Sequence, residues 1–169
     1  MNNFSQLIEK VKKLPRKKLA VAAAEDEEVL LVVEKPLVAC CAAVEKVNAE
    51  GMSATVDAAL LAKMCDRGQI ANCIVDGPLG LDNAISEESA RIKKINSPVA
   101  GKADILLFND IESANFTYKT IVQLCKAGKV GNLIGGSKAP MVISSRADSH
   151  EVKYLSIVLA MLTSSASTN

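Results

Sequence analysis

The chain has 169 residues, a length that suits one domain with a sizeable core. Hydrophobic residues make up 49% of it, and 20 basic residues nearly balance 19 acidic ones, which argues against a disordered chain and against a strongly basic nucleic-acid-binding protein. With no tryptophan, two tyrosines and three phenylalanines, it has few aromatic platforms for single-stranded nucleic acid.

The cysteine pattern predicts reduced, mostly buried thiols in a cytoplasmic protein, because the number is odd and no C-x-x-C pair occurs. A zinc site is not expected, since His150 is the single histidine and the cysteines lack ligand spacing. Residues 1–20 lack the apolar core of a secretory signal, and no apolar run approaches the length of a membrane span. The cysteines are Cys40, Cys41, Cys65, Cys73 and Cys125.

The first part of the chain predicts one helix and two strands. Apolar residues recur at helical spacing over residues 4–14, and Pro15 ends that helix. The nearly all-apolar runs 19–24 and 37–43 are typical of buried parallel strands. Between them, residues 25–28 are acidic, as a first helical turn often is, and the β-branched residues of 29–33 fit a helix or a strand.

From residue 51 onwards, strands alternate with helices. A turn over 51–55 and a turn at Asp76-Gly77-Pro78 are predicted from their residue types. The predicted strands are 73–75, 103–108, 132–134 and 141–143. The predicted helices are 56–64 (ended by Gly68), 82–94, 111–126 and 149–162, with a frayed tail after residue 163. Because the strands are apolar throughout, we expect a mostly parallel sheet covered by helices on both faces.

Ligands of such sheets bind beyond the carboxyl ends of the strands. Polar or glycine-rich residues follow four of the predicted strands in this chain. They are Asp76-Gly77-Pro78, Asn109-Asp110, Gly135-Gly136-Ser137 and Ser144-Ser145-Arg146. This edge of the sheet is therefore the expected site.

The segment 140–151 is the most informative of these. Asp148 or Ser149 opens the last helix, and Asp148 with Glu151 has the spacing of a capping box. A hydroxyl and a guanidinium, Ser145 and Arg146, come just before that helix N-terminus, which favours anions. Residues 140–151 alone fit a phosphate or carboxylate site and a plain helix cap with a surface arginine equally well.

Other chemistry is less well supported. The glycines at 128, 131, 135 and 136 match neither nucleotide fingerprint, and no G-x-S-x-G elbow surrounds Ser145, so Ser145 is a better oxyanion donor than nucleophile. His150 is more consistent with a solvent-facing position in a first helical turn than with a general base. Asn115 and Lys119 are four residues apart and share one face of the predicted helix 111–126.

Three motifs occur in a specific order and spacing: V-D-G-P-L-G-L-D-N-A (75–84), A-G-K-A-D-I-L-L-F-N-D-I-E-S-A-N-F-T-Y-K (100–119) and A-P-M-V-I-S-S-R-A-D-S (139–149). Together with 37–48 and 57–70, they resemble the phosphate acetyltransferase/butyryltransferase family, with greater similarity to its butyryl branch. One departure is Ser113-Ala114-Asn115, because the family usually has glycine before the asparagine.

The resemblance implies a truncated form of a larger fold. Family members are about twice as long, with two α/β domains flanking an active-site cleft. The resemblance implies that residues 1–35 come from the first domain, and that 36–169 form most of the second α/β domain with its C-terminal helix. Much of the family's chain, including basic residues that help hold phosphate and coenzyme A, is then absent near residues 34–36. The implied fold is a truncated three-layer αβα architecture of the isocitrate/isopropylmalate dehydrogenase type.

The resemblance implies the reaction of acyl-CoA with inorganic phosphate, giving acyl phosphate and free coenzyme A. By motif match, Ser145 and Arg146 stabilise phosphate and the developing negative charge, and Asp148 and Glu151 are the candidates for the catalytic carboxylate. The implied substrate-binding residues are Asp76, Asp110, Asn115 and Lys119. Coenzyme A thioester is a substrate, no metal or bound cofactor is implied, and a homo-oligomer, dimer or larger, is expected.

Two hypotheses follow. The first is a phosphate acyltransferase of the butyryl type whose activity is impaired by the missing segment, since a cleft that lacks one wall positions its substrates poorly. The second is a non-catalytic remnant that acts as a binding or oligomerisation module of the same fold. A dinucleotide-dependent dehydrogenase is disfavoured because the chain lacks the corresponding fingerprint.

Overall fold

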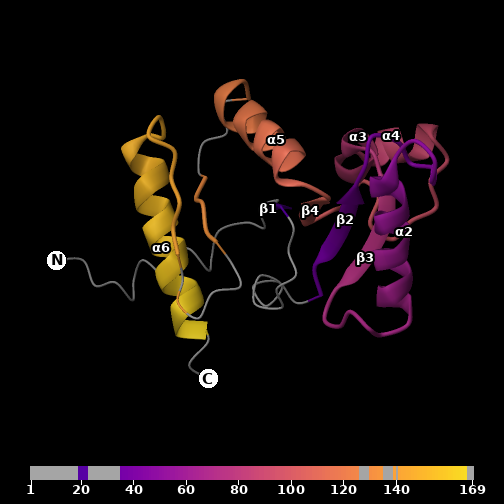
Figure 1. Cartoon of the computed structure of the whole chain (residues 1–169), viewed down its shortest axis with the longest axis horizontal. Coiled ribbons are helices and arrows are strands. Elements are labelled where there is room, and N and C mark those ends of the chain that lie inside the picture. Colours follow the sequence, from indigo (N-terminus) through magenta and orange to yellow (C-terminus); the bar gives the residue numbers. More distant parts are fainter. Residues whose placement is uncertain (1–18, 23–34, 126–129, 135–138, 140, 167–169) are drawn as a thin grey trace. The chain divides into compact units, whose positions relative to one another are not determined.

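The computed structural model describes residues 19–22, 35–125, 130–134, 139 and 141–166 (Figure 1). The predicted helix 4–14 and the segment 25–33 lie outside these residues. By internal contacts the chain divides into two units, residues 18–118 and residues 1–17 with 119–169, and each is described by itself. This division does not bear on which residues derive from which domain of the family.

The first unit contains a four-stranded parallel sheet, as the apolar strands predict. Its strands are β1 (Leu19–Ala22), β2 (Leu37–Cys41), β3 (Ile74–Leu79) and β4 (Ile105–Phe108), in the spatial order β1-β4-β2-β3. In the centre of the sheet, Val38 of β2 pairs with Val75 on one side and with Ile105 on the other.

Helices cover both faces of this sheet, so the three-layer αβα architecture is confirmed. Alternate residues of β2 point to opposite faces, with Val38 and Cys40 on one and Ala39 and Cys41 on the other, and all four are buried. The Val38 face packs against helix α2 (Ser53–Asp66), which runs alongside β2 and β3 in Figure 1. Helices α3 (Leu81–Ile85), α4 (Glu87–Ile92) and α5 (Ile111–Gln123) contribute one buried alanine each to the opposite cluster: Ala84, Ala90 and Ala114.

The turn predicted at Asp76-Gly77-Pro78 is wrong, because all three residues lie inside β3. Asp76 pairs with Ala39 and Leu79 pairs with Cys41, with a shift in register between them. A β-carbon at Gly77 would lie 2.7 Å from Cys40 Cβ and 2.8 Å from the Cys40 carbonyl oxygen. Glycine is therefore needed here for the close approach of β3 to β2, and this requirement looks the same in sequence as turn chemistry.

The predicted helices 56–64 and 82–94 have different boundaries in the structure. The predicted turn over 51–55 is shorter than expected, because α2 already begins at Ser53. The predicted helix 82–94 is broken at Ser86, whose hydroxyl accepts a hydrogen bond from the Ser89 N–H at 3.2 Å and so caps α4. Serine competes with the helical backbone for hydrogen bonds, which favours a new helix start at this position.

The second unit contains the C-terminal helix α6 (His150–Ala166), which extends four residues beyond the predicted end at residue 162. The predicted strands 132–134 and 141–143 are wrong. Among the described residues of these segments, only Ile134 and Met141 pair, as one antiparallel bridge with a 2.9 Å hydrogen bond. Apolar runs of two residues (133–134) and three residues (141–143) are too short for their pattern to separate strand from irregular backbone.

Candidate anion-binding site

The segment before α6 folds into a tight turn that Asp148 closes from inside. The Asp148 carboxylate accepts a 2.7 Å hydrogen bond from the Ser145 N–H, and the Asp148 N–H donates to the Ser145 carbonyl at 3.1 Å. Asp148 is 8% exposed, whereas its neighbours Arg146 and Ala147 are exposed. The carboxylate therefore shapes the turn from its buried side and leaves the arginine in solvent.

The two groups that the sequence assigned to an anion are adjacent at the tip of this turn. Ser145 is half-buried, and its hydroxyl oxygen accepts a 3.3 Å hydrogen bond from the Ala147 N–H, which leaves its proton to be donated. Among the described residues, the Arg146 guanidinium has no ion pair, and the Arg146 carbonyl accepts a 3.5 Å contact from Lys153 Nζ. Arg146, Lys153 and the Ser145 hydroxyl give this end of α6 a donor-rich, positive character.

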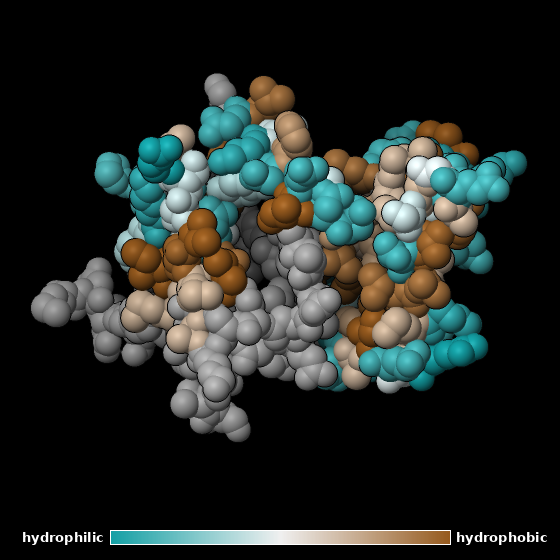
Figure 2. All heavy atoms as spheres, in the orientation of Figure 1, coloured by the Kyte–Doolittle hydropathy of each residue, from teal (hydrophilic) through white to brown (hydrophobic). Residues whose placement is uncertain are grey.

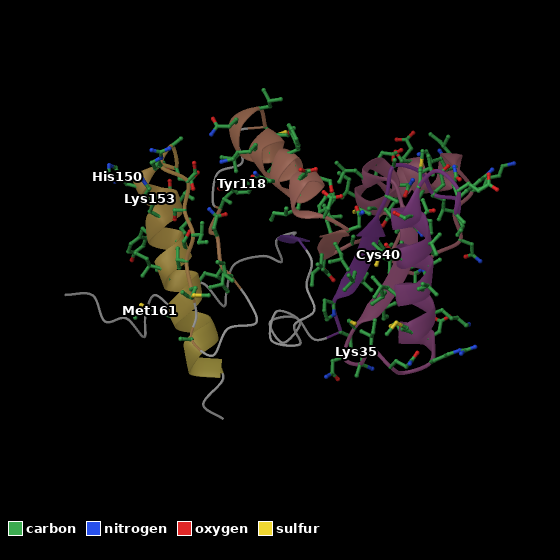
Figure 3. All side chains as sticks on the ribbon, viewed as in Figure 1. Lys35, Cys40, Tyr118, His150, Lys153 and Met161 are labelled. Atoms are coloured by element: carbon green, nitrogen blue, oxygen red, sulfur yellow. The ribbon has the colours of Figure 1, made fainter. Side chains whose placement is uncertain are left out.

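Ser149 is the residue that caps α6, which decides between the two predicted cap residues. Its hydroxyl accepts from the Val152 N–H at 3.3 Å, and the first helical bond joins the Lys153 N–H to the Ser149 carbonyl at 3.1 Å. The N–H groups of His150 and Glu151 precede that bond and point out of the helix end. Both side chains are exposed, and Figure 3 places His150 and Lys153 at this end of α6.

The predicted substrate-binding carboxylates lie in the first unit and are already engaged in local contacts. Asp76 accepts a hydrogen bond from the Gly77 N–H at 2.8 Å and sits level with the middle of β4, not at the end of the sheet. Asp110 accepts two 2.7 Å hydrogen bonds from the N–H and hydroxyl of Ser113 and caps α5. These bonds lower the pKa of Asp110 and keep it charged.

Asn115 and Lys119 both lie on α5, four residues apart, as the sequence predicts for neighbours on one helix face. Asn115 is exposed and Lys119 is half-buried. The structure thus brings Ser145, Arg146, Asp148 and Glu151 together in one segment, and Asn115 and Lys119 onto one helix.

Two residues that hold the turn were missed by the sequence reasoning. Asn132 Nδ2 donates a 3.3 Å hydrogen bond to the Asp148 carboxylate, and the Asn132 N–H donates to the Ser156 hydroxyl at 2.8 Å. Asn132 is sixteen residues from Asp148 in a run read as a strand, and a buried serine in a helix gives no chemical signal of its own. No pattern in the sequence pointed to this contact.

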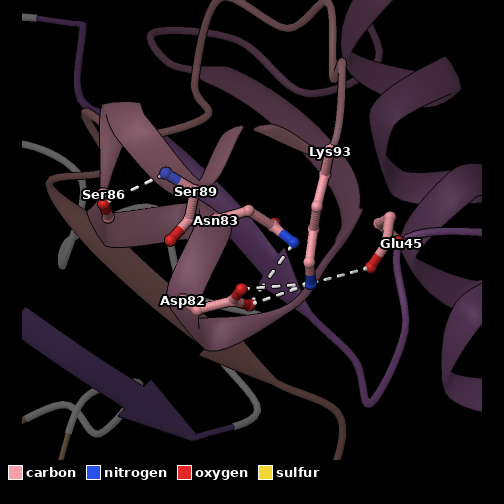
Figure 4. A network of polar contacts seen from close by, with 6 residues as sticks. All are labelled: Glu45, Asp82, Asn83, Ser86, Ser89 and Lys93. Carbon is pink, nitrogen blue, oxygen red and sulfur yellow. Dashed lines mark hydrogen bonds and ion pairs between the residues drawn. The ribbon is translucent and has the colours of Figure 1, made fainter. Parts of the chain in front are cut away.

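A second polar cluster, at α3 and α4, was also missed (Figure 4). Lys93 Nζ lies 3.0 Å from the Asp82 carboxylate and 3.2 Å from that of Glu45. The hydrogen bond from Lys93 lowers the pKa of Asp82, and the same bond raises the pKa of Lys93, so both remain charged. This ion-pair cluster ties the loop after β2 to α3 and α4.

The thiols only partly follow the prediction. Cys40 and Cys41 are buried, Cys65 and Cys73 are half-buried, and Cys125 is exposed. Burial raises the pKa of Cys40 and Cys41 to about 12, with added repulsion from Cys41 and Asp76 at Cys40. Thiols in such surroundings are poor nucleophiles, which argues against a catalytic role for these two cysteines.

The described residues thus comprise a parallel αβα sheet in one unit and, in the other, a turn with exposed donors ahead of a helix. The family model described as "Phosphate acetyl/butaryl transferase" matches residues 5–161. The chain belongs to this family.

Its relatives include proteins named phosphate acetyltransferase and proteins named phosphate butyryltransferase. The chain is 55% identical to a phosphate acetyltransferase of Thermotoga maritima over 123 residues, which is 73% of this chain and 41% of that protein. It is 57% identical to a phosphate butyryltransferase of Clostridium beijerinckii over 119 residues, which is 70% of this chain and 39% of that protein. The chain thus spans about two fifths of the length of these relatives, which confirms that it is much shorter than they are.

Solved structures agree on the fold. A branched-chain phosphotransacylase from Enterococcus faecalis is similar with a TM-score of 0.69 and 33% identity, over 82% of this chain and 50% of that one. A phosphotransacetylase from Staphylococcus aureus is similar with a TM-score of 0.64 and 25% identity. None of the helices that the structure describes is long and apolar enough to cross a bilayer.

Proposed function

We propose that this chain acts on acyl-CoA and inorganic phosphate, moving a short, butyryl-like acyl group between coenzyme A and phosphate. The observation that carries the proposal is the Ser145–Arg146 pair, held by buried Asp148 beside the N-terminus of α6, in a chain of the acetyl/butyryl transferase family. The cytoplasmic setting and a homo-oligomer are parts of the same proposal.

In the proposed reaction, a phosphate oxygen attacks the thioester carbonyl. The new bond joins phosphate oxygen to acyl carbon, the carbon–sulfur bond breaks, and coenzyme A leaves as a thiolate that takes up a proton. Arg146 binds the phosphate oxygens through its planar fork, and the Ser145 hydroxyl donates to phosphate or to the developing oxyanion. Positioning and charge stabilisation of this kind are sufficient for acyl transfer between two bound substrates.

Asp148 and Glu151 take different parts in this proposal. The Asp148 carboxylate is buried and accepts hydrogen bonds from Ser145 and Asn132, so in this proposal it holds the shape of the turn. Glu151 is exposed in the first turn of α6 and is the carboxylate with access to a substrate. We therefore assign the catalytic carboxylate to Glu151, and retain Asp76, Asp110, Asn115 and Lys119 as proposed substrate-binding residues.

The test is release of coenzyme A thiol from butyryl-CoA in the presence of phosphate, compared with acetyl-CoA. We expect slow, phosphate-dependent release that Arg146→Ala abolishes. A rate equal to that of the Clostridium beijerinckii relative would contradict the impaired-activity claim. Release that does not depend on phosphate would contradict the proposed reaction itself.

The non-catalytic binding module remains a second candidate because α6 exposes apolar side chains to solvent (Figure 2). Ile157 is 54% exposed and Met161 is 46% exposed, one turn apart on the helix. Sedimentation and calorimetric titration with coenzyme A distinguish the two candidates. Coenzyme A binding, in whatever oligomeric state the chain adopts, supports the enzyme, whereas an oligomer without coenzyme A affinity supports the module.

A further inference from the structure

The turn that carries Ser145 and Arg146 is fixed by a buried network in the same unit. Asp148 Oδ2 accepts hydrogen bonds from two donors, the Ser145 N–H at 2.7 Å and Asn132 Nδ2 at 3.3 Å. A carboxylate with 8% exposure has little contact with water, so these donors replace the hydrogen bonds that water would give it. Asn132 thus stabilises the same oxygen that holds the Ser145 backbone.

Asn132 is itself anchored to α6. Its N–H donates to the Ser156 hydroxyl at 2.8 Å, and that hydroxyl donates to the Val152 carbonyl at 2.7 Å. Ser156 is fully buried, with no exposed surface. One serine therefore connects the second turn of the helix to the backbone of the 130–134 segment.

The close approach of this segment to the helix depends on Gly131. A β-carbon there would lie 3.2 Å from the Leu155 carbonyl group and from the Ser156 nitrogen, all of which are backbone atoms. This packing brings the Asn132 side chain within reach of Asp148. Gly131, which fits no nucleotide motif, is thereby explained by the packing of the segment against α6.

We propose that Asn132 and Ser156 are positioning residues for phosphate, acting through Asp148 on Ser145 and Arg146. This inference rests on the proposed function. The Ser145 N–H donates to Asp148 and is therefore not available to phosphate. Phosphate binds instead to the Ser145 hydroxyl and the Arg146 side chain, both of which project from a turn of fixed shape. Loss of the Asn132 amide leaves Asp148 short of a donor and releases the turn.

The experiment measures phosphate affinity of the full chain by calorimetry and exchange of the Ser145 amide by NMR, in wild type and Asn132→Ala. We expect phosphate affinity to fall about tenfold, the equivalent of one charge-assisted hydrogen bond, and Ser145 exchange to accelerate. Tyr154→Phe is the matched control, because it removes one polar atom from an exposed position on α6. It should leave both readouts unchanged.

Asn132→Asp adds a readout that a purely structural role would not move. Two facing carboxylates repel at neutral pH but share a proton in acid, so the affinity of this variant relative to wild type should recover as pH falls. Unchanged phosphate affinity in Asn132→Ala, with the variant folded, overturns the inference. If wild type does not bind phosphate, the proposed function fails. Exchange of the Ser145 amide then tests the network by itself: faster exchange in Asn132→Ala supports the network, and unchanged exchange overturns it.

Discussion

Replacing Gly77 by alanine tests the packing of the motif that the sequence presented as a turn. The new methyl group would meet Cys40 Cβ at 2.7 Å, the Cys40 carbonyl oxygen at 2.8 Å and Ala58 Cβ at 3.1 Å. All three distances are shorter than ordinary van der Waals contact, and one partner is backbone, which cannot rotate away. Either β3 moves away from β2 or the central register of the sheet changes.

The expected cost is that of overpacking a close-packed core. Such insertions cost about 1–3 kcal/mol, and we expect the upper part of that range because two strands and α2 meet at this point. For a chain of this size, a loss of about 2 kcal/mol lowers the midpoint of thermal unfolding by roughly 4–8 °C. Urea unfolding followed by circular dichroism measures the loss directly.

Gly51→Ala provides the matched control. A β-carbon at Gly51 would meet only the Asn48 side chain, at 3.3 Å or more, and that side chain is able to move. We expect its free energy of unfolding to stay within about 0.5 kcal/mol of wild type. A Gly77→Ala variant as stable as Gly51→Ala would refute the packing of β3 against Cys40.

Three further predictions concern the helix caps and the thiols. Ser149→Ala should lower the free energy of unfolding by about 1 kcal/mol in urea titrations, because the Val152 N–H loses its acceptor, and a neutral result would remove Ser149 as the cap of α6. The lowered pKa of Asp110 means that its carboxylate stabilises the native state above the unfolded pKa of about 3.9, and that this stabilisation is lost as pH falls through the folded pKa. The stability gap between wild type and Asp110→Asn should therefore be larger at pH 7 than in strong acid, and an equal gap would contradict the cap charge. In native alkylation at pH 8 followed by mass spectrometry, exposed Cys125 should react well before Cys40, whose pKa of about 12 leaves little thiolate, and faster labelling of Cys40 would contradict its burial.

The sheet could be predicted from sequence because its signal is local. Runs such as Leu37–Cys41 are apolar at every position, as expected of a short strand that is buried on both faces of a sheet. Gly77 and Pro78 were misread because a glycine that allows close packing and a glycine that allows a turn have the same sequence signature. The order β1-β4-β2-β3 could not be read at all, since it depends on which strands meet after folding.

The candidate site was predictable to the same limited extent. Ser145 and Arg146 were found because their types and their place before a helix suit an anion, and resemblance to a family sharpened that interpretation. The separate parts of Asp148 and Glu151 were not predictable, because both carboxylates lie near the start of α6 and only burial distinguishes them. The contact from Asn132 to Asp148 spans sixteen residues and depends on the packing of Gly131 against α6.

Formation of the acyl phosphate product is the most direct test of the central claim that the Ser145–Arg146 turn holds phosphate for acyl transfer. Butyryl-CoA and phosphate are incubated with wild type and with Arg146→Ala, and the acyl phosphate is trapped as its hydroxamate, with a phosphate-free reaction as the blank. We predict hydroxamate above the blank for wild type, in small amounts, and none for Arg146→Ala. Equal hydroxamate from both proteins, or none above the blank from wild type, would contradict the account.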